Sequence, residues 1–263
     1  MRLLRALCVP LSFFLAILFF AMGALASPCE EEQPYNWYVK RNAEHKQPTL
    51  DRHQGRLDGH NAVYVDSRYA DAEEKVLYLT FDAGYENGNV ERILNVLKEE
   101  NAPAAFFVLK NIVIKHPNLI KRMDAEGHLV CNHTMTHRDT TTLSDAEFKE
   151  ELNGLASLCQ EKAGVSMAGF YRPPEGRYNE KTLRLASELG YKTVFWSFAY
   201  ADWDNDKQPS ADAAMKKILD NVHNGAILLL HPTSDTNATI LPALIQTLRA
   251  EGYRFASLSE LEG

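Results

Sequence analysis

The feature that most constrains the fold is the apolar run Val76–Phe81, which ends at the carboxylate of Asp82. A run this apolar and rich in strand-forming residues predicts a strand buried on both faces, as in a parallel α/β sheet. Because a carboxylate deep in such a strand is costly to bury, we expect Asp82 at the carboxyl end, where α/β folds place their chemistry. The run alone leaves a second interpretation equally open, in which Asp82 is a loop residue that caps a helix beginning near Val90.

From Lys75 onward, strand-like and helix-like apolar patterns alternate. Strands are predicted after this first one at about 104–108, 128–132, 167–171, 193–198, 226–230 and 254–257. Helices are predicted at about 90–100, 117–126, 144–162, 180–189 and 210–222, with a last one ending near 249. About seven β/α units of this kind indicate a barrel-like or doubly wound parallel sheet.

Polar residues follow these strands within a few positions: Asp82, His133, Arg172, Asp202 and His231. All fall at the carboxyl end of a predicted strand. A barrel brings those ends together on one face, so five residues far apart in the sequence are expected to converge on one site.

Each of these residues also has a simpler explanation. His133 and His137 are four residues apart, which lets both face one metal ion, but two histidines in a loop are common and a third ligand, with Asp82 the first candidate, must come from a distant strand. Arg172, stiffened by two prolines, is a carboxylate clamp or a surface arginine. His231 is either a structural histidine at the edge of the core or a catalytic acid. Asp202 either orients a histidine or forms a turn with its own backbone.

Taken together, a carboxylate base, an imidazole acid and partners that fix both are suited to water-mediated hydrolysis of an amide or ester.

The N-terminus differs from the rest of the chain. Arg2 and Arg5 precede an uncharged apolar run, and Ala24-Leu25-Ala26 supplies small residues for cleavage, the layout of a secretory signal peptide over residues 1–26. A retained membrane anchor is the alternative. Cleavage after Ala26 takes the formal net charge from −7 to −9, which excludes the electrostatic footprint of a nucleic-acid-binding protein.

Residues 27–72 form a polar, proline-containing stretch interrupted by aromatic residues, which predicts an N-terminal arm packed against a main domain at 73–263. Removal of the signal leaves Cys29, Cys131 and Cys159, an odd number that excludes full intramolecular pairing. A Cys131–Cys159 disulfide is one option, and two buried thiols are the simpler one.

Five short motifs occur in order along the chain: Thr80-Phe81-Asp82, His133-Thr134-x-x-His137, Arg172-Pro173-Pro174, Asp202-Trp203 and Leu228-x-x-His231. The series resembles the motifs of NodB-type polysaccharide deacetylases, carbohydrate esterase family four, over about residues 75–261. The segment Leu79–Gly88 is more similar still to the branch that deacetylates N-acetylmuramic acid of peptidoglycan and forms the muramic δ-lactam of spore cortex. The resemblance implies an α/β fold, a distorted (β/α) barrel.

The resemblance also implies roles for individual residues. Asp82 would be the general base, held by Arg172, and His231 the general acid, held by Asp202. Three further roles are implied: metal ligation by His133 and His137, oxyanion binding by the backbone N–H of Glu175, and a pocket for the acetyl methyl lined by Trp203 and Leu229.

Ala83 departs from the family pattern, because most members carry there a second aspartate as the third metal ligand. The δ-lactam branch lacks it too. With two neutral histidines and no dedicated carboxylate, we expect a divalent ion such as zinc to be held only weakly.

The resemblance implies a secreted, monomeric enzyme that acts on peptidoglycan strands at the cell wall or spore cortex, with no nucleic-acid partner. Two alternatives remain open from the sequence: deacetylation of another polymer, chitin-like or xylan, and a non-catalytic glycan-binding protein.

Overall fold

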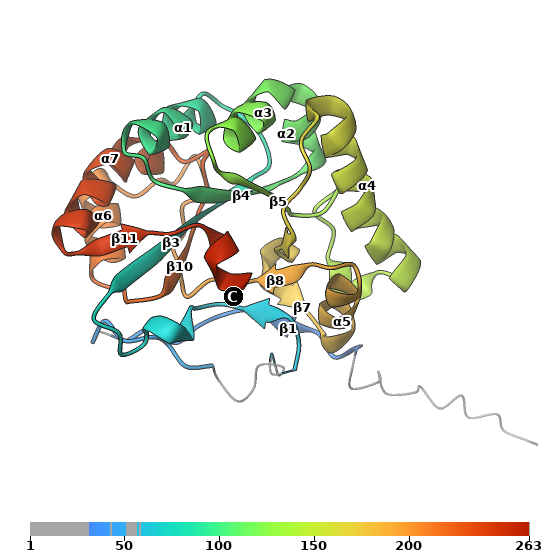
Figure 1. Cartoon of the computed structure of the whole chain (residues 1–263), viewed down its shortest axis with the longest axis horizontal. Coiled ribbons are helices and arrows are strands. Elements are labelled where there is room, and N and C mark those ends of the chain that lie inside the picture. The colour runs from blue at the N-terminus through green and yellow to red at the C-terminus, as the bar shows by residue number, and fades with distance from the viewer. Residues whose placement is uncertain (1–31, 43, 51–56, 58, 263) are drawn as a thin grey trace, which may run out of the picture.

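A parallel sheet that curls into a barrel, with helices around its outside, dominates the computed structural model (Figure 1). The structure describes residues 32–42, 44–50, 57 and 59–262. The signal peptide predicted at 1–26 and Cys29 lie outside the described residues, as do the first residues of the predicted arm. In the part of the chain that is described, no helix is long and apolar enough to cross a membrane.

The strands and α-helices are, in chain order, β1 (Tyr35–Asn36), β2 (Ala62–Val63), β3 (Lys75–Ala83), α1 (Asn89–Glu99), β4 (Ala104–Val108), α2 (Lys110–Lys115), α3 (Pro117–Ala125), β5 (Leu129–Asn132), α4 (Asp145–Ala163), β6 (Phe170–Tyr171), β7 (Arg177–Tyr178), α5 (Glu180–Glu188), β8 (Lys192–Val194), β9 (Phe198–Ala199), α6 (Ala211–Leu219), β10 (Ala226–Leu230), α7 (Asp235–Ala250) and β11 (Tyr253–Phe255).

The barrel closes through one interrupted strand. Neighbours run β8-β6-β5-β4-β3-β10-β9, all parallel, and residues 195–197 join β8 to β9. The ring of partners therefore returns to its start, and Ser197 donates its backbone N–H to Ile227 on the way. Since the strands are parallel, their carboxyl ends share one rim, as the predicted (β/α) barrel requires.

Strand β3 shows why its sequence is apolar throughout. Leu79 and Phe81 belong to the large cluster between the sheet and the surrounding helices. Val76 and Tyr78, on the alternate face, belong to the cluster inside the barrel. A strand buried on both faces needs apolar residues at every position. Asp82 comes next to last in this strand, so the interpretation as a strand-end residue is confirmed.

The structure differs from the predicted elements at several places, among them the short strands β1, β2 and β7, which were not predicted. The single strand predicted at 193–198 is two strands. The first, β8, pairs with β6, and the second, β9, pairs with β10. The short helix α2 was not predicted; it occupies six of the residues between β4 and the helix that begins at Pro117. The helix predicted from Ser144 is α4, and its capping box is present.

The two cysteines inside the barrel domain lie on opposite faces of the sheet. Cys131 belongs to the interior cluster, whereas Cys159 of α4 belongs to the cluster beneath the helices. They are buried and are not joined by a disulfide, so the simpler of the two predictions holds.

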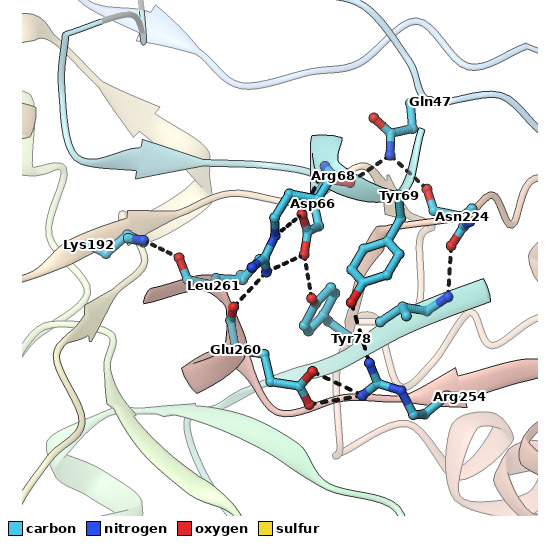
Figure 2. Close-up of polar contacts among 11 residues, drawn as sticks. Gln47, Asp66, Arg68, Tyr69, Tyr78, Lys192, Asn224, Arg254, Glu260 and Leu261 are labelled. Atoms are coloured by element: carbon cyan, nitrogen blue, oxygen red, sulfur yellow. Dashed lines mark hydrogen bonds and ion pairs between the residues drawn. The ribbon is translucent and has the colours of Figure 1, made fainter. Parts of the chain in front are cut away.

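Residues of the predicted arm run along the barrel beside β8 and β10, and Figure 2 shows how one end is fixed. The buried Asp66 carboxylate accepts hydrogen bonds from Arg68 and from the hydroxyl of the buried Tyr78. Arg68 also donates to the carbonyl oxygen of Glu260, and Gln47 donates to the carbonyl oxygen of Asp66. The arm is thereby tied to β3 and to the C-terminal turn.

We expect Tyr78→Phe to lower the free energy of unfolding by about 1–3 kcal/mol, because it leaves a buried carboxylate with one fewer donor. The matched control is Tyr69→Phe, whose hydroxyl makes only a long 3.4 Å contact with Arg254 at the surface; about 0.5 kcal/mol or less is expected there. Urea unfolding of both variants measures the difference, and equal losses would show that the Tyr78–Asp66 bond contributes nothing specific.

Candidate active site

Every residue singled out from the sequence lies at the carboxyl rim of the barrel, in or directly behind one cavity of about 730 Å³. The cavity is lined by Asp82, Gly84, Tyr85, Leu109, His133, His137, Glu175, Trp196, Ala199, Tyr200, Trp203, Leu229, His231 and Thr233. Arg172 and Asp202 lie behind this lining and are fully buried. The volume is in the range of small-ligand pockets.

Arg172 is a buried clamp rather than a surface arginine. It follows β6, and its Nη1 donates to Oδ1 of Asp82 at 2.7 Å. Its other nitrogens donate to the hydroxyl of Thr80 and to the carbonyl oxygen of Val194. The guanidinium also lies 4.1 Å from the ring centroid of Phe107. The guanidinium is therefore held by hydrogen bonds around its edge and by an aromatic ring on one face. Because the guanidinium cannot move, the Asp82 carboxylate that it binds is also fixed.

Two opposing effects set the protonation of Asp82. Burial raises the pKa of this carboxyl, but the charge of Arg172 is the largest of the effects that oppose burial, and the net pKa lies below its ordinary value. Asp82 is consequently ionised at neutral pH and has one oxygen, Oδ2, that Arg172 does not contact. A buried carboxylate with a free oxygen facing a cavity is equipped to accept a proton.

His133 presents a lone pair to that oxygen. Its Nδ1 lies 2.8 Å from the carbonyl oxygen of Arg172, and since a carbonyl only accepts, Nδ1 carries the hydrogen. Burial lowers the pKa of His133 to about 4, so the ring is neutral and Nε2 is an acceptor. Nε2 faces Oδ2 of Asp82 at 3.5 Å. Two acceptors at this distance favour a cation or a water molecule between them.

His137 lies beside His133, with ring centroids 5.0 Å apart and planes nearly perpendicular. The loop achieves this through left-handed backbone at Thr134 (φ 72°) and His137 (φ 59°). The hydroxyl of Thr134 accepts from the N–H of His137 and supports the turn. The two imidazoles therefore come from a tight loop, not from a helix.

These residues fit a loosely held divalent cation. Imidazole nitrogens are suitable ligands for such an ion, and the opposed acceptors of His133 and Asp82 mark a place for positive charge. Among the residues that the structure describes, however, no group of three or more His, Cys, Asp or Glu side chains is arranged to hold a metal ion. Ala83 supplies no ligand atom and is fully buried in the cluster beneath the helices.

The second catalytic candidate, His231, follows β10 and is fixed by Asp202. Its Nδ1 donates to Oδ1 of Asp202 at 2.7 Å, and its backbone N–H donates to Oδ2 at 2.8 Å. Burial lowers the pKa of His231, but the Asp202 carboxylate more than offsets this, and the net pKa is raised. With Nδ1 occupied, Nε2 is the nitrogen available to the cavity, and it carries a proton more readily than in water.

Three predicted substrate-binding residues also line the cavity. Glu175 has left-handed backbone (φ 55°), which turns the chain sharply after the two prolines. Trp203 is 60% exposed, and its ring centroid lies 6.0 Å from that of His231. Leu229 is almost fully buried and forms part of the cavity floor.

Several supporting residues were not predicted from the sequence. Asn237 of α7 donates to Oδ2 of Asp202 and to the carbonyl oxygen of His231, and it accepts from the hydroxyl of Tyr200. Thr80 accepts from Arg172. The strand alternation that places Asp82 inside the barrel also places Thr80 there, so Thr80 was within reach of a pattern argument. No sequence signal identifies Asn237.

Comparison with known proteins identifies the family. The family model of polysaccharide deacetylase matches residues 69–194. An uncharacterized 30.6 kDa protein of Geobacillus stearothermophilus is 38% identical over 93% of this chain and 91% of its own length. The peptidoglycan-N-acetylmuramic acid deacetylase PdaA of Bacillus subtilis is 36% identical over 94% of this chain and 92% of its own length.

The fold gives the same result. The solved structure of Bacillus subtilis PdaA, a family 4 carbohydrate esterase, superimposes with a TM-score of 0.81 over 88% of this chain and 97% of that one, at 36% sequence identity. The distorted (β/α) barrel and the family resemblance predicted from the motifs are thereby confirmed. This chain belongs to the polysaccharide deacetylase family, carbohydrate esterase family four, and is a hydrolase that acts on the amide bond of N-acetyl groups.

Proposed function

We propose that this protein removes N-acetyl groups from peptidoglycan, and specifically from N-acetylmuramic acid, the reaction that leads to muramic δ-lactam in spore cortex. The observation that carries the reaction is the pair of buried dyads around one cavity, Asp82 with Arg172 and His231 with Asp202. One dyad keeps a base ionised and the other keeps an acid protonated, which is the arrangement that general acid–base hydrolysis needs.

In the proposed mechanism, Oδ2 of Asp82 takes a proton from water as the water oxygen bonds to the acetamide carbonyl carbon. The backbone N–H of Glu175 donates to the oxygen that becomes negative. His231 then protonates the nitrogen from Nε2 as the C–N bond breaks, leaving acetate and a free amine on the sugar. His133 and His137 would hold a divalent cation, which when bound would supply Lewis acidity at the reaction centre. Trp203 and Leu229 enclose the acetyl methyl.

Similarity supports the choice of muramic acid over other sugars. The Bacillus subtilis relative that is named a peptidoglycan-N-acetylmuramic acid deacetylase matches nearly the whole chain, whereas a chitooligosaccharide deacetylase of Rhizobium leguminosarum matches 73% of it at 33% identity. The proposed substrate places the protein outside the cytoplasm, at the cell wall or cortex, in agreement with the signal peptide predicted at 1–26. We propose that it works there as a monomer on glycan strands.

Substrate competition tests the specificity. The protein is offered equal amounts of defined oligosaccharides from peptidoglycan, chitin and acetylated xylan, and released acetate is assigned to each by mass spectrometry. Preferred loss from N-acetylmuramic acid is expected. Activity confined to glucosamine units would overturn the muramic assignment, and binding of peptidoglycan with no acetate release would support a non-catalytic glycan-binding protein.

Metal dependence is expected to be measurable but weak. Two imidazoles without a third protein ligand hold a divalent ion less tightly than a three-ligand zinc site. Dialysis against a chelator should lower acetate release, and added zinc or a similar divalent ion should restore it. Metal analysis of the dialysed protein should find far less than one ion per chain. One tightly retained zinc per chain would contradict this expectation.

A further inference from the structure

The N-terminal arm contacts two loops that border the site, one at residues 173–176 and the other at residues 195–197. Strand β1 pairs antiparallel with β7, and the backbone N–H of Trp37 donates to the carbonyl oxygen of Gly176. These bonds hold the chain directly after Glu175, the residue whose backbone N–H faces the cavity in the proposed mechanism. The arm thus fixes one of the two loops through backbone hydrogen bonds.

The side chain of Trp37 fixes the other loop, at residues 195–197. Its Nε1–H donates to the carbonyl oxygen of Trp196 at 2.9 Å. Its ring stacks on Phe195, with centroids 4.3 Å apart and planes 20° from parallel. Trp37 is only 5% exposed. A buried indole that satisfies its N–H and stacks on a neighbouring ring leaves the loop little freedom.

Trp37 also joins the two loops to each other. A side chain at Gly176 would place its Cβ 2.8 Å from the Cβ of Trp37 and 2.8 Å from the ring of Trp196. No ordinary side chain fits in that space, because the Cβ of Trp37 and the indole of Trp196 both pack closely against Gly176. Trp37 therefore bridges the two loops, with its backbone and Cβ against Gly176 and its indole against residues 195–197.

These loops carry the groups that orient the base. Arg172 donates to the carbonyl oxygens of Val194 and Phe195, and its guanidinium lies 5.7 Å from the ring centroid of Trp196. The same guanidinium binds Asp82. A path of direct contacts thus runs from Trp37 through Phe195 and Trp196 to Arg172, and from there to the proposed base.

We infer that Trp37 is a positioning residue for the deacetylation reaction, which holds the Arg172–Asp82 pair and the Glu175 backbone in working geometry from outside the cavity. It does not line the cavity, so it touches neither the substrate nor the reacting atoms. The inference rests on the proposed roles of Asp82 and Arg172. It makes the arm, which precedes all five sequence motifs, a part of the catalytic apparatus.

The test compares Trp37→Ala and Trp37→Phe with a control elsewhere in the arm. Gln47→Ala removes two hydrogen bonds, to the carbonyl oxygens of Asp66 and Asn224, and touches neither loop (Figure 2). For each variant, kcat and KM for acetate release from amidase-treated peptidoglycan are measured well below its thermal midpoint. Circular dichroism checks the fold.

Trp37→Ala is expected to lower kcat about 10- to 100-fold with KM little changed, because small displacements of catalytic groups reduce the rate of the chemical step. Trp37→Phe, which keeps the stacking on Phe195, should recover part of the loss, and Gln47→Ala should keep the wild-type kcat. If Trp37→Ala does not fold, the Trp37→Phe variant is used alone, and a lowered kcat with little change in KM is again the expected result.

Wild-type kcat in the folded Trp37 variants, or a raised KM with unchanged kcat, would overturn the positioning role. Asp82→Asn is assayed alongside to separate the two proposals. If Asp82→Asn remains active, the assignment of the base fails; if it is inactive and the Trp37 variants match Gln47→Ala, only the role of the arm fails.

Discussion

Asp82→Asn is expected to lower acetate release about 100- to 10,000-fold, the contribution of a general base, while the protein stays folded. An amide does not accept the proton of the attacking water, and this is the function proposed for Oδ2. The asparagine oxygen still accepts from Nη1 of Arg172, so the buried guanidinium keeps a partner. Acetate release and the thermal midpoint are measured on the same preparation.

Asp235→Asn is the matched control, because it makes the same change in a carboxylate that is paired with Arg92 at the surface. It should retain wild-type activity. An Asp82→Asn protein that still releases acetate at the wild-type rate would refute Asp82 as the base. Loss of both activity and fold would instead show that the Asp82–Arg172 pair is needed for stability.

His231→Ala should reduce the rate by a similar factor, about 100- to 10,000-fold, because the departing amine then lacks its proton donor. The control is His223→Ala, which removes a buried histidine from just before β10 rather than just after it. Both variants lose an imidazole beside the same strand, but only His231 lines the cavity. Equal activity in the two variants would contradict the role of His231 as general acid.

The pH profile provides a second check on His231. Its pKa is raised in the folded protein, chiefly by Asp202 acting against burial, so the acid form persists above the ordinary histidine pKa. The rate is expected to fall as pH rises through that raised value, because the acid form is then lost. Asp202→Asn removes the opposing charge and should move this falling limb to lower pH. An unmoved limb would show that another group donates the proton.

Local pattern was sufficient for the regular part of the fold. Strands β4 and β10 lie at the predicted residues, and β3 ends one residue after Asp82, close to where its apolar run predicted. Each of these strands is buried on both faces, so an apolar residue is required at nearly every position. The strand-end residues were found for the same reason, since a polar residue directly after such a run is conspicuous.

The remaining features depend on contacts between distant parts of the chain. Trp37 and Trp196 are 159 residues apart, and nothing near Trp37 indicates that its N–H bonds to that carbonyl oxygen. The link from Asn237 to Asp202 is likewise long-range. The break between β8 and β9 arises because β8 pairs with β6 and β9 pairs with β10, and the apolar pattern of residues 193–198 does not indicate those partners. Hydrophobic periodicity in the sequence indicates which residues are buried, but it does not identify which distant residues they pack against.

The most direct test of the proposed function is to locate the acetyl group that is lost. Amidase-treated peptidoglycan is incubated with the wild-type protein or with Asp82→Asn, digested to disaccharides, and analysed by tandem mass spectrometry. The expected result is loss of acetyl from muramic acid, with matching free acetate, in the wild-type sample alone. Acetyl loss from glucosamine units only, or the same loss with Asp82→Asn as with the wild type, would contradict the account.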